Sequence, residues 1–191
     1  MNENNTLREI EALIKKKYPQ PAVESLMRAV KYAVAAHKGQ TRKCQKIPYS
    51  IHLLEVTKYL LEHTDPRVDT ATIMAAALHD TIEDTTTTSE TLTEHFGDEV
   101  SSLVQALTKK KLPDKLRADK EYQEQLEREG KRDERVYLIK LSDVLHNAQT
   151  LEVHNEKRHL EIKQQIREYY VPLAERLGWI AEAERLKTLG E

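Results

Sequence analysis

The sequence feature that most constrains the fold is a short apolar segment, from Ile73 to Leu78, that has almost no polar side. A helix with apolar residues on every side is stable only when other elements surround it. Asp69 or Thr70 can cap such a helix at its start, because a short polar side chain can accept from a backbone N–H of the first turn. The segment therefore predicts a buried central helix with other helices packed around it.

The remainder of the sequence also has helical periodicity, with apolar residues recurring every three or four positions. The chain has only 5 Gly and 6 Pro in 191 residues, and runs of β-branched residues are few, which disfavours a strand-rich fold. We expect an all-α fold, a compact bundle of roughly nine to ten helices in one domain that spans residues 1–191. The expected helices are 7–18, 21–37, 49–63, 69–84, 89–95, 98–109, 116–129, 133–150 and 155–191, the last with a break near Pro172.

Composition excludes several classes of protein. The formal net charge of -2 gives no general basic field, so binding of nucleic acid is not expected. No apolar stretch approaches the roughly 20 residues that span a bilayer. Cys44 is the single cysteine, which rules out an intramolecular disulfide and fits a reducing compartment. We expect a cytoplasmic protein with no nucleic-acid or membrane partner.

The stretch from Lys109 to Arg135 is the most charged and the least periodic part of the chain. Charge runs usually face water, so a solvated helix is one interpretation. A mobile flap is the other. The sequence leaves both open.

Charged residues follow directly on the apolar segment, in His79-Asp80-Thr81-Ile82-Glu83-Asp84. On a continuous helix His79 lies beside Glu83, and Asp80 beside Asp84, because residues four apart share a face. Three acids within two turns repel one another, and burial of an unpaired carboxylate is costly. Since a bound cation would turn this repulsion into attraction, the cluster predicts a metal site.

A second polar pair lies in another apolar helix, where Asp143 and Asn147 are again four residues apart. A third candidate is His52, which stands near the start of its predicted helix among apolar neighbours. Taken singly, Asp143 is more often a salt-bridged or capping acid, and His52 is more often a hydrogen-bonded core histidine. Their combination with the first cluster favours a shared metal site.

In this order, His52, His79-Asp80 and Asp143 resemble the H…HD…D metal set of the HD phosphohydrolase superfamily. The surrounding sequence resembles, more narrowly, the hydrolase domain of the RelA/SpoT homologues, the enzymes of (p)ppGpp metabolism. The resemblance covers about residues 33–179. Its segments are Ala36 to Gln40, Arg42-Lys43, Pro48 to His52, His79 to Asp84, Phe96-Gly97 with Val100, Thr108-Lys109, Lys140 to Leu151 and Tyr170 to Gly178.

The resemblance implies an HD-domain helical bundle in which His52, His79, Asp80 and Asp143 hold one metal ion. Imidazole and carboxylate ligands suit a divalent metal with open positions for water and substrate, and the resemblance implies Mn²⁺. The other implied site residues form two groups. Glu83 and Asp84 position the attacking water and handle its proton, while Arg42, Lys43, Tyr49, Asn147 and Thr150 bind the substrate.

The implied reaction is hydrolysis of the 3′-pyrophosphate of (p)ppGpp to GDP or GTP and pyrophosphate. The chain looks like a small alarmone hydrolase rather than a bifunctional enzyme, and its oligomeric state is left open. Other substrates for the same metal chemistry are (p)ppApp and the 2′-phosphate of NADPH. A non-catalytic, antitoxin-like nucleotide-binding module is a further alternative, which the retention of all four implied ligands disfavours.

Three departures from the family pattern concern the substrate more than the metal. The usual His-Pro is His52-Leu53, and the usual Ala-Asp-Arg is Ser142-Asp143-Val144. The loop from Cys44 to Ile47 replaces a shorter stretch that often contains Ser-Gly. Because that loop approaches the nucleobase in the family, the choice between guanine and adenine stays open.

Overall fold

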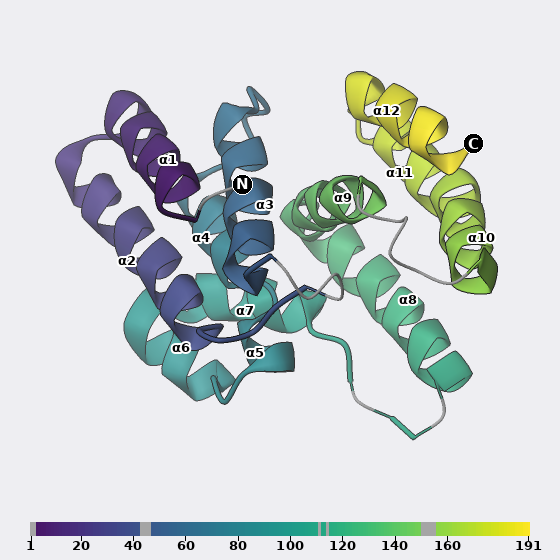
Figure 1. Cartoon of the computed structure of the whole chain (residues 1–191), viewed down its shortest axis with the longest axis horizontal. Coiled ribbons are helices and arrows are strands. Elements are labelled where there is room, and N and C mark those ends of the chain that lie inside the picture. The colour runs from purple at the N-terminus through teal and green to yellow at the C-terminus, as the bar shows by residue number, and fades with distance from the viewer. Residues whose placement is uncertain (1–2, 43–46, 111, 114, 150–155) are drawn as a thin grey trace. The chain divides into compact units, whose positions relative to one another are not determined.

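The computed structural model describes residues 3–42, 47–110, 112–113, 115–149 and 156–191 (Figure 1). The chain divides into two compact units, residues 1–140 and 141–191, and α9 (Arg135–Ala148) contributes to both. In the part of the chain that is described, the pairing outside helices is an isolated bridge between Thr41 and Pro48. The predicted all-α class is therefore confirmed, while one domain over residues 1–191 stays a prediction.

The first unit is built around the predicted central helix. α4 packs against α2, α3 and α7, while α1 packs on α3 and α6 on α7. Residues Ala75 to Leu78 are at most 1% exposed, which confirms that this apolar segment lies in the core. The helices of this unit are α1 (Glu3–Lys17), α2 (Gln20–Ala36), α3 (Tyr49–Glu62), α4 (Thr70–Leu78), α5 (Thr81–Asp84), α6 (Ser89–Phe96), α7 (Asp98–Leu107) and α8 (Lys115–Arg132).

The two ends of α4 are formed differently. At its start the carboxylate of Asp69 accepts from the backbone N–H of Thr72 at 2.8 Å, which is the predicted cap. At its end the helix stops at Leu78, and the hydroxyl of Thr81 donates to the Leu78 carbonyl at 2.6 Å. The expected continuous helix through residue 84 is thus wrong: α4 ends at Leu78, whose carbonyl accepts from the Thr81 hydroxyl, and a separate helix, α5, begins at Thr81. His79 and Asp80 form a turn between α4 and the short α5.

The second unit contains the end of α9 together with α10 (Glu156–Gln165), the π-helical turn η2 (Ile166–Tyr170), α11 (Val171–Arg176) and α12 (Ile180–Gly190). The predicted break near Pro172 is found as η2, which joins α10 to α11. Proline has no N–H to donate to a helical carbonyl, so the hydrogen-bond register changes just before it.

The charged stretch between Lys109 and Arg135 is helical over α8. Leu126 is buried at 1% exposure, whereas the pairs Arg117–Glu121 and Lys131–Glu127 lie along the solvent side four residues apart. The described part of the stretch is therefore a helix with a solvated side, as in the first interpretation, while the mobile flap stays a prediction.

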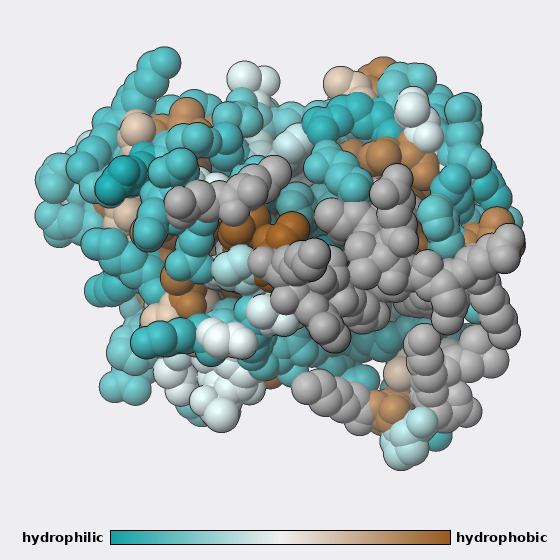
Figure 2. Space-filling view, in the orientation of Figure 1, coloured by the Kyte–Doolittle hydropathy of each residue, from teal (hydrophilic) through white to brown (hydrophobic). Residues whose placement is uncertain are grey.

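The surface that Figure 2 shows is mostly hydrophilic, with small apolar patches. The large apolar side chains most exposed in the described part are Leu160, at 63%, and Ile180, at 57%, both in the second unit. No helix among these residues is long and apolar enough to cross a membrane.

Close packing of α8 against α9 depends on a glycine. A methyl group on Gly130 would overlap the ring of Tyr137, which is only 2% exposed. The Tyr137 hydroxyl donates to the carbonyl of Glu127 at 3.2 Å, so the ring is held over α8. Glycine is unfavourable inside a helix, and here its missing side chain is what lets the ring approach.

We predict that Gly130→Ala lowers the free energy of unfolding by about 1–3 kcal/mol, the usual effect of an added methyl group in a packed core. On helix propensity alone the substitution would stabilise the protein by about 1 kcal/mol, so the two effects have opposite signs. Urea denaturation measures the difference. Lys120→Ala, at a position of α8 that is 79% exposed, is the control and should change stability little. A Gly130→Ala protein as stable as wild type would contradict the close approach.

Candidate metal centre

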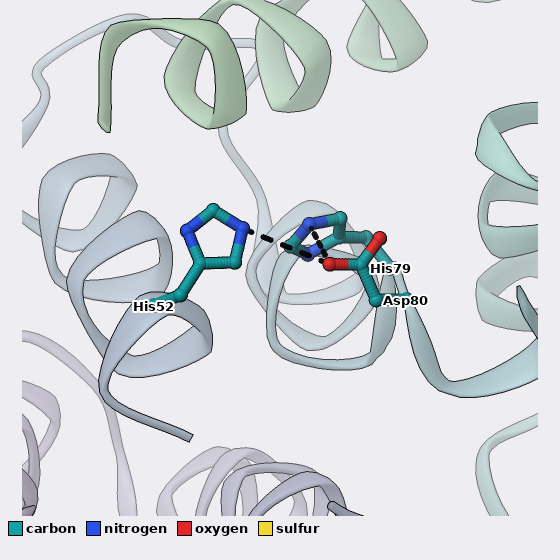
Figure 3. Close-up of side chains that lie close together, drawn as sticks. All are labelled: His52, His79 and Asp80. Carbon is teal, nitrogen blue, oxygen red and sulfur yellow. Dashed lines mark ion pairs between the residues drawn. The ribbon is translucent and has the colours of Figure 1, made fainter. Parts of the chain in front are cut away.

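Three of the four predicted metal ligands converge at the end of the central helix. His52 comes from α3, while His79 and Asp80 form the turn after α4 (Figure 3). The Oδ2 atom of Asp80 lies 3.0 Å from Nε2 of His79 and 3.7 Å from Nε2 of His52. One donor atom from each residue lies within 4.8 Å of the others. Both imidazoles are buried, and the Asp80 side chain is 20% exposed.

The chemistry of these three donors fits a divalent cation. Nδ1 of His79 lies 2.8 Å from the carbonyl of Ala76, and because a carbonyl only accepts, Nδ1 carries the proton. Nε2 of the neutral ring then presents a lone pair to the Asp80 carboxylate. Two such acceptors at 3.0 Å repel each other unless a proton or a cation lies between them. An outer hydrogen bond that fixes the tautomer is typical of histidines that bind metals.

Tyr49 contacts the same carboxylate. Its hydroxyl donates to Oδ2 of Asp80 at 2.7 Å, and its ring packs edge-on against His52 with centroids 5.6 Å apart. The sequence predicted a role for Tyr49 in substrate binding, and that role stays a prediction. Its contact with Asp80 was missed, although Tyr49 stands one turn before His52 on α3.

Glu83 is the third residue of the short α5. Its Oε2 atom accepts from the backbone N–H of Lys109 at 3.0 Å. Burial raises the pKa of Glu83, and the negative charges of Asp80 and Asp84 raise it further, against the opposing effects of the Lys109 N–H and of Lys140. A carboxylate with a raised pKa is a better base near neutral pH, so the structure gives Glu83 a property that proton transfer requires. Asp84 is exposed.

In the second unit, Asp143 and Asn147 form the predicted pair. Nδ2 of Asn147 donates to Oδ1 of Asp143 at 2.5 Å, and Asp143 is only 6% exposed. The amide thus holds a buried carboxylate in one orientation. That Asp143 completes the ligand set of the first unit stays a prediction.

Of the remaining predicted substrate residues, Arg42 is described, and its guanidinium lies 5.7 Å from the centre of the Tyr49 ring. Lys43 and Thr150 lie outside the described residues. Their roles, and those of Arg42 and Asn147, stay predictions.

Known proteins resemble this chain over most of its length. The profile of the HD domain matches residues 29–180. A "Guanosine-3′,5′-bis(diphosphate) 3′-pyrophosphohydrolase" of Aquifex aeolicus is 43% identical over 162 residues, which are 84% of this chain and 22% of that protein. A "GTP pyrophosphokinase" of Myxococcus xanthus is 39% identical over 171 residues, 85% of this chain and 22% of its own length. The chain thus spans less than a quarter of these curated relatives.

A solved structure matches this chain over most of the length of both chains. It bears the description "A metazoan ortholog of SpoT hydrolyzes ppGpp and plays a role in starvation responses", and it superposes with a TM-score of 0.64 at 29% identity. The match covers 90% of this chain and 88% of that one. With the matching profile extending over both units and including the His52, His79-Asp80 and Asp143 positions, the chain belongs to the HD-domain family.

Proposed function

We propose that this chain is a metal-dependent hydrolase that removes the 3′-pyrophosphate from (p)ppGpp, giving GDP or GTP and pyrophosphate. The observation that carries the proposal is the convergence of two buried imidazoles, His52 and His79, with the partly buried carboxylate of Asp80 at the end of the core helix, a donor set that suits a divalent ion. A site of this kind serves hydrolysis at phosphorus, because a divalent ion can neutralise phosphate charge and make water more acidic.

The comparisons support (p)ppGpp as the substrate. The metazoan protein, which is described as hydrolysing ppGpp, is matched over 88% of its chain, so the shared region accounts for most of that chain. The relative named as a pyrophosphokinase is matched over only 22% of its length, which makes its name a weaker guide to this region. Hydrolysis is therefore the activity that we propose, in the cytoplasmic compartment that the single cysteine indicates.

We propose Mn²⁺ as the ion, with Asp143 as the fourth protein ligand. Two imidazoles and two carboxylates make a mixed nitrogen and oxygen set without thiolate, which suits this metal. A bound divalent ion supplies a Lewis acid that polarises a phosphoryl oxygen and makes a nearby water more acidic. The protein holds the ligands ready, through Ala76 on His79, Tyr49 on Asp80 and Asn147 on Asp143.

Glu83 and Asp84 are the proposed proton-handling pair. Glu83 accepts a proton from the attacking water, whose oxygen ends on pyrophosphate, and a proton returns to the 3′-oxygen of the ribose that leaves. The raised pKa of Glu83 brings its basicity closer to neutral pH, where proton transfer is most effective. The Lys109 N–H orients the carboxylate through Oε2.

Arg42, Lys43, Tyr49, Asn147 and Thr150 are the proposed substrate-binding residues. Arg42 lies over an aromatic ring, and its planar guanidinium can stack on a base in the same manner. Lys43 supplies a compact positive charge for phosphate. The Tyr49 hydroxyl bonds to Asp80 in the metal centre, and the Tyr49 ring lies beside Arg42. We therefore propose that Tyr49 serves both metal binding and substrate binding.

The first test is turnover of a nucleotide panel by the purified chain with Mn²⁺, with products separated by chromatography. We expect the wild-type chain to release pyrophosphate and GDP or GTP from (p)ppGpp. The Asp80→Ala variant should release neither pyrophosphate nor GDP or GTP. Release of orthophosphate from NADPH, or preference for (p)ppApp, would assign the same centre to another substrate. Saturable binding without turnover of any member would make the chain a nucleotide-binding module.

The second test concerns the fourth ligand. Asp143→Ala should weaken Mn²⁺ binding by more than about tenfold, since even substitutions of residues that only orient a ligand lower metal affinity by about that factor. Titration calorimetry on the full chain measures it. Asp98→Ala removes an exposed acid from the first turn of α7 and is the matched control. Wild-type affinity for Mn²⁺ in the Asp143→Ala protein would remove this residue from the ligand set.

The third test separates activity from stability at Glu83. Glu83→Gln should cut kcat by about 10²-fold or more, because an amide takes no proton, and should leave Mn²⁺ bound. The metal-free variant should also unfold at a higher temperature than wild type at pH 7, by no more than a few degrees, because the partly buried charge is removed and the amide oxygen can still accept from Lys109.

The pH dependence of this gain has a definite sign. Folding raises the pKa of Glu83, so the folded state carries the cost of its charge in full above the raised pKa. The gain in Glu83→Gln should therefore shrink as the pH falls through that pKa, and it should vanish below the ordinary value of 4.5. Thermal unfolding of both metal-free proteins across this range checks it. A gain that does not change with pH would show that the stability difference has another cause.

A further inference from the structure

The connection between α2 and α3 is closed on itself by backbone hydrogen bonds. The N–H of Gln40 donates to the carbonyl of His37, and the N–H of Tyr49 donates to the carbonyl of Gln40, both at 3.0 Å. Farther out, the N–H of Arg42 donates to the carbonyl of Ile47 at 2.9 Å. Gly39 has a φ of 83°, a left-handed conformation that glycine adopts without strain and that reverses the chain after α2. His37, Gln40 and Tyr49 are thereby fixed to one another.

These residues contact α5 at both of its ends. At the start of α5 the Tyr49 hydroxyl donates to the carboxylate of Asp80. At its end the side-chain amide of Gln40 donates to the backbone carbonyl of Asp84 at 2.8 Å. Between these two points α5 carries Glu83. Gln40 of the connection and Tyr49, the first residue of α3, thus bond to the last residue of α5 and to the residue before α5.

His37 joins the two contacts. It is 1% exposed, its ring stacks on that of Tyr49 with centroids 5.0 Å apart and planes 15° apart, and its Nδ1 lies 2.8 Å from Oε1 of Gln40. Because the amide N–H of Gln40 is directed at the Asp84 carbonyl, the amide oxygen faces His37 and accepts from Nδ1–H. The imidazole therefore supports the ring of Tyr49 on one side and orients the amide of Gln40 on the other.

The short helix needs such support. α5 has only four residues, of which Thr81 is buried, and a single turn is unstable without tertiary contacts. Its position relative to the metal ligands nevertheless decides whether the Glu83 carboxylate can meet the attacking water, and proton transfer requires an approach within hydrogen-bonding distance.

We propose that Gln40 and His37 are positioning residues that hold α5, and with it Glu83, in place relative to Asp80. The catalytic part of this proposal, the proton transfer by Glu83, rests on the proposed function. The structural part, the holding of α5, does not. Gln40 fixes the end of α5 and Tyr49 fixes its start, so their loss has different consequences. Removal of the Gln40 amide frees the catalytic end of the turn and leaves the metal ligands in place, while removal of the Tyr49 hydroxyl frees a ligand.

The experiment compares Gln40→Leu, Tyr49→Phe and Gln20→Leu in the full chain. Gln40→Leu should lower kcat by about tenfold or more and leave the Mn²⁺ dissociation constant within about twofold, whereas Tyr49→Phe should raise that constant by about tenfold. Gln20→Leu changes an exposed glutamine of α2 and should match wild type in both measurements. His37→Phe keeps the stacked ring but loses the bond to Gln40, so its kcat should fall as in Gln40→Leu.

Hydrogen exchange gives a readout that needs no substrate. The N–H of Asp84 donates to the carbonyl of Asp80, and that of Thr85 to the carbonyl of Thr81. In Gln40→Leu both amides should exchange faster than in wild type, while the amides of α4 keep their protection.

Three results would overturn the inference. The first is wild-type kcat and wild-type exchange in Gln40→Leu, and the second is a loss of Mn²⁺ binding together with protection throughout the first unit, which would mark a general structural role. The third is Tyr49→Phe with the same pattern of effects as Gln40→Leu. If wild type hydrolyses no member of the nucleotide panel, the proposed function fails, and the exchange and Mn²⁺ measurements still decide the role of Gln40.

Discussion

The site depends on the burial of α4, a helix in which every residue from Ala71 to Leu78 except the partly exposed Met74 is buried. Its last residue, Leu78, is directly followed by two polar residues, the buried His79 and the partly buried Asp80, so polar side chains begin immediately at the edge of the core. A carboxylate at such a boundary is costly unless other groups compensate its charge. Asp80 has the Tyr49 hydroxyl and the two imidazoles within reach, and these are the groups from which the metal centre is made.

The side chains of the metal centre are oriented by hydrogen bonds from groups around them. The Ala76 carbonyl sets the tautomer of His79, the Tyr49 hydroxyl orients Asp80, and the Lys109 N–H orients Glu83. The Ala76 carbonyl belongs to α4, the helix just before His79. The Tyr49 hydroxyl and the Lys109 N–H come from parts of the chain distant in sequence from Asp80 and Glu83. Such outer bonds hold ligands in the geometry that binds metal, so little rearrangement is needed when an ion arrives.

Much of this could be predicted from the sequence, because its causes are local. The apolar run from Ile73 to Leu78 predicted a buried helix, Asp69 predicted its cap, and the four-residue spacing predicted the pair Asp143 and Asn147. The break at His79 was not predicted, because a Thr hydroxyl can bond to a preceding carbonyl in a continuing helix, as Thr57 does in α3, as well as where a helix ends, as Thr81 does.

The contacts that periodicity could not reveal join residues far apart in the chain. The bond from Tyr49 to Asp80 spans 31 residues, that from Gln40 to Asp84 spans 44, and that from Lys109 to Glu83 spans 26. Hydrophobic patterns show which side of an element faces the core, but they do not show which polar groups of two elements will meet. The ligand types were therefore visible in the sequence, and the groups that orient them were not.

The abrupt boundary after Leu78 also limits how the gene can change. Each residue of an α-helix advances the chain by about 1.5 Å and turns it by about 100°, given the 3.6 residues of a turn. An insertion or deletion between the cap at Asp69 and the turn at His79 would therefore move the ligands along the helix axis and rotate them away from His52 at the same time. Side chains in this segment can be exchanged for others of similar volume, whereas its length is bound to the metal centre. Among related chains, alignment gaps should be absent between these two positions even where the apolar residues differ.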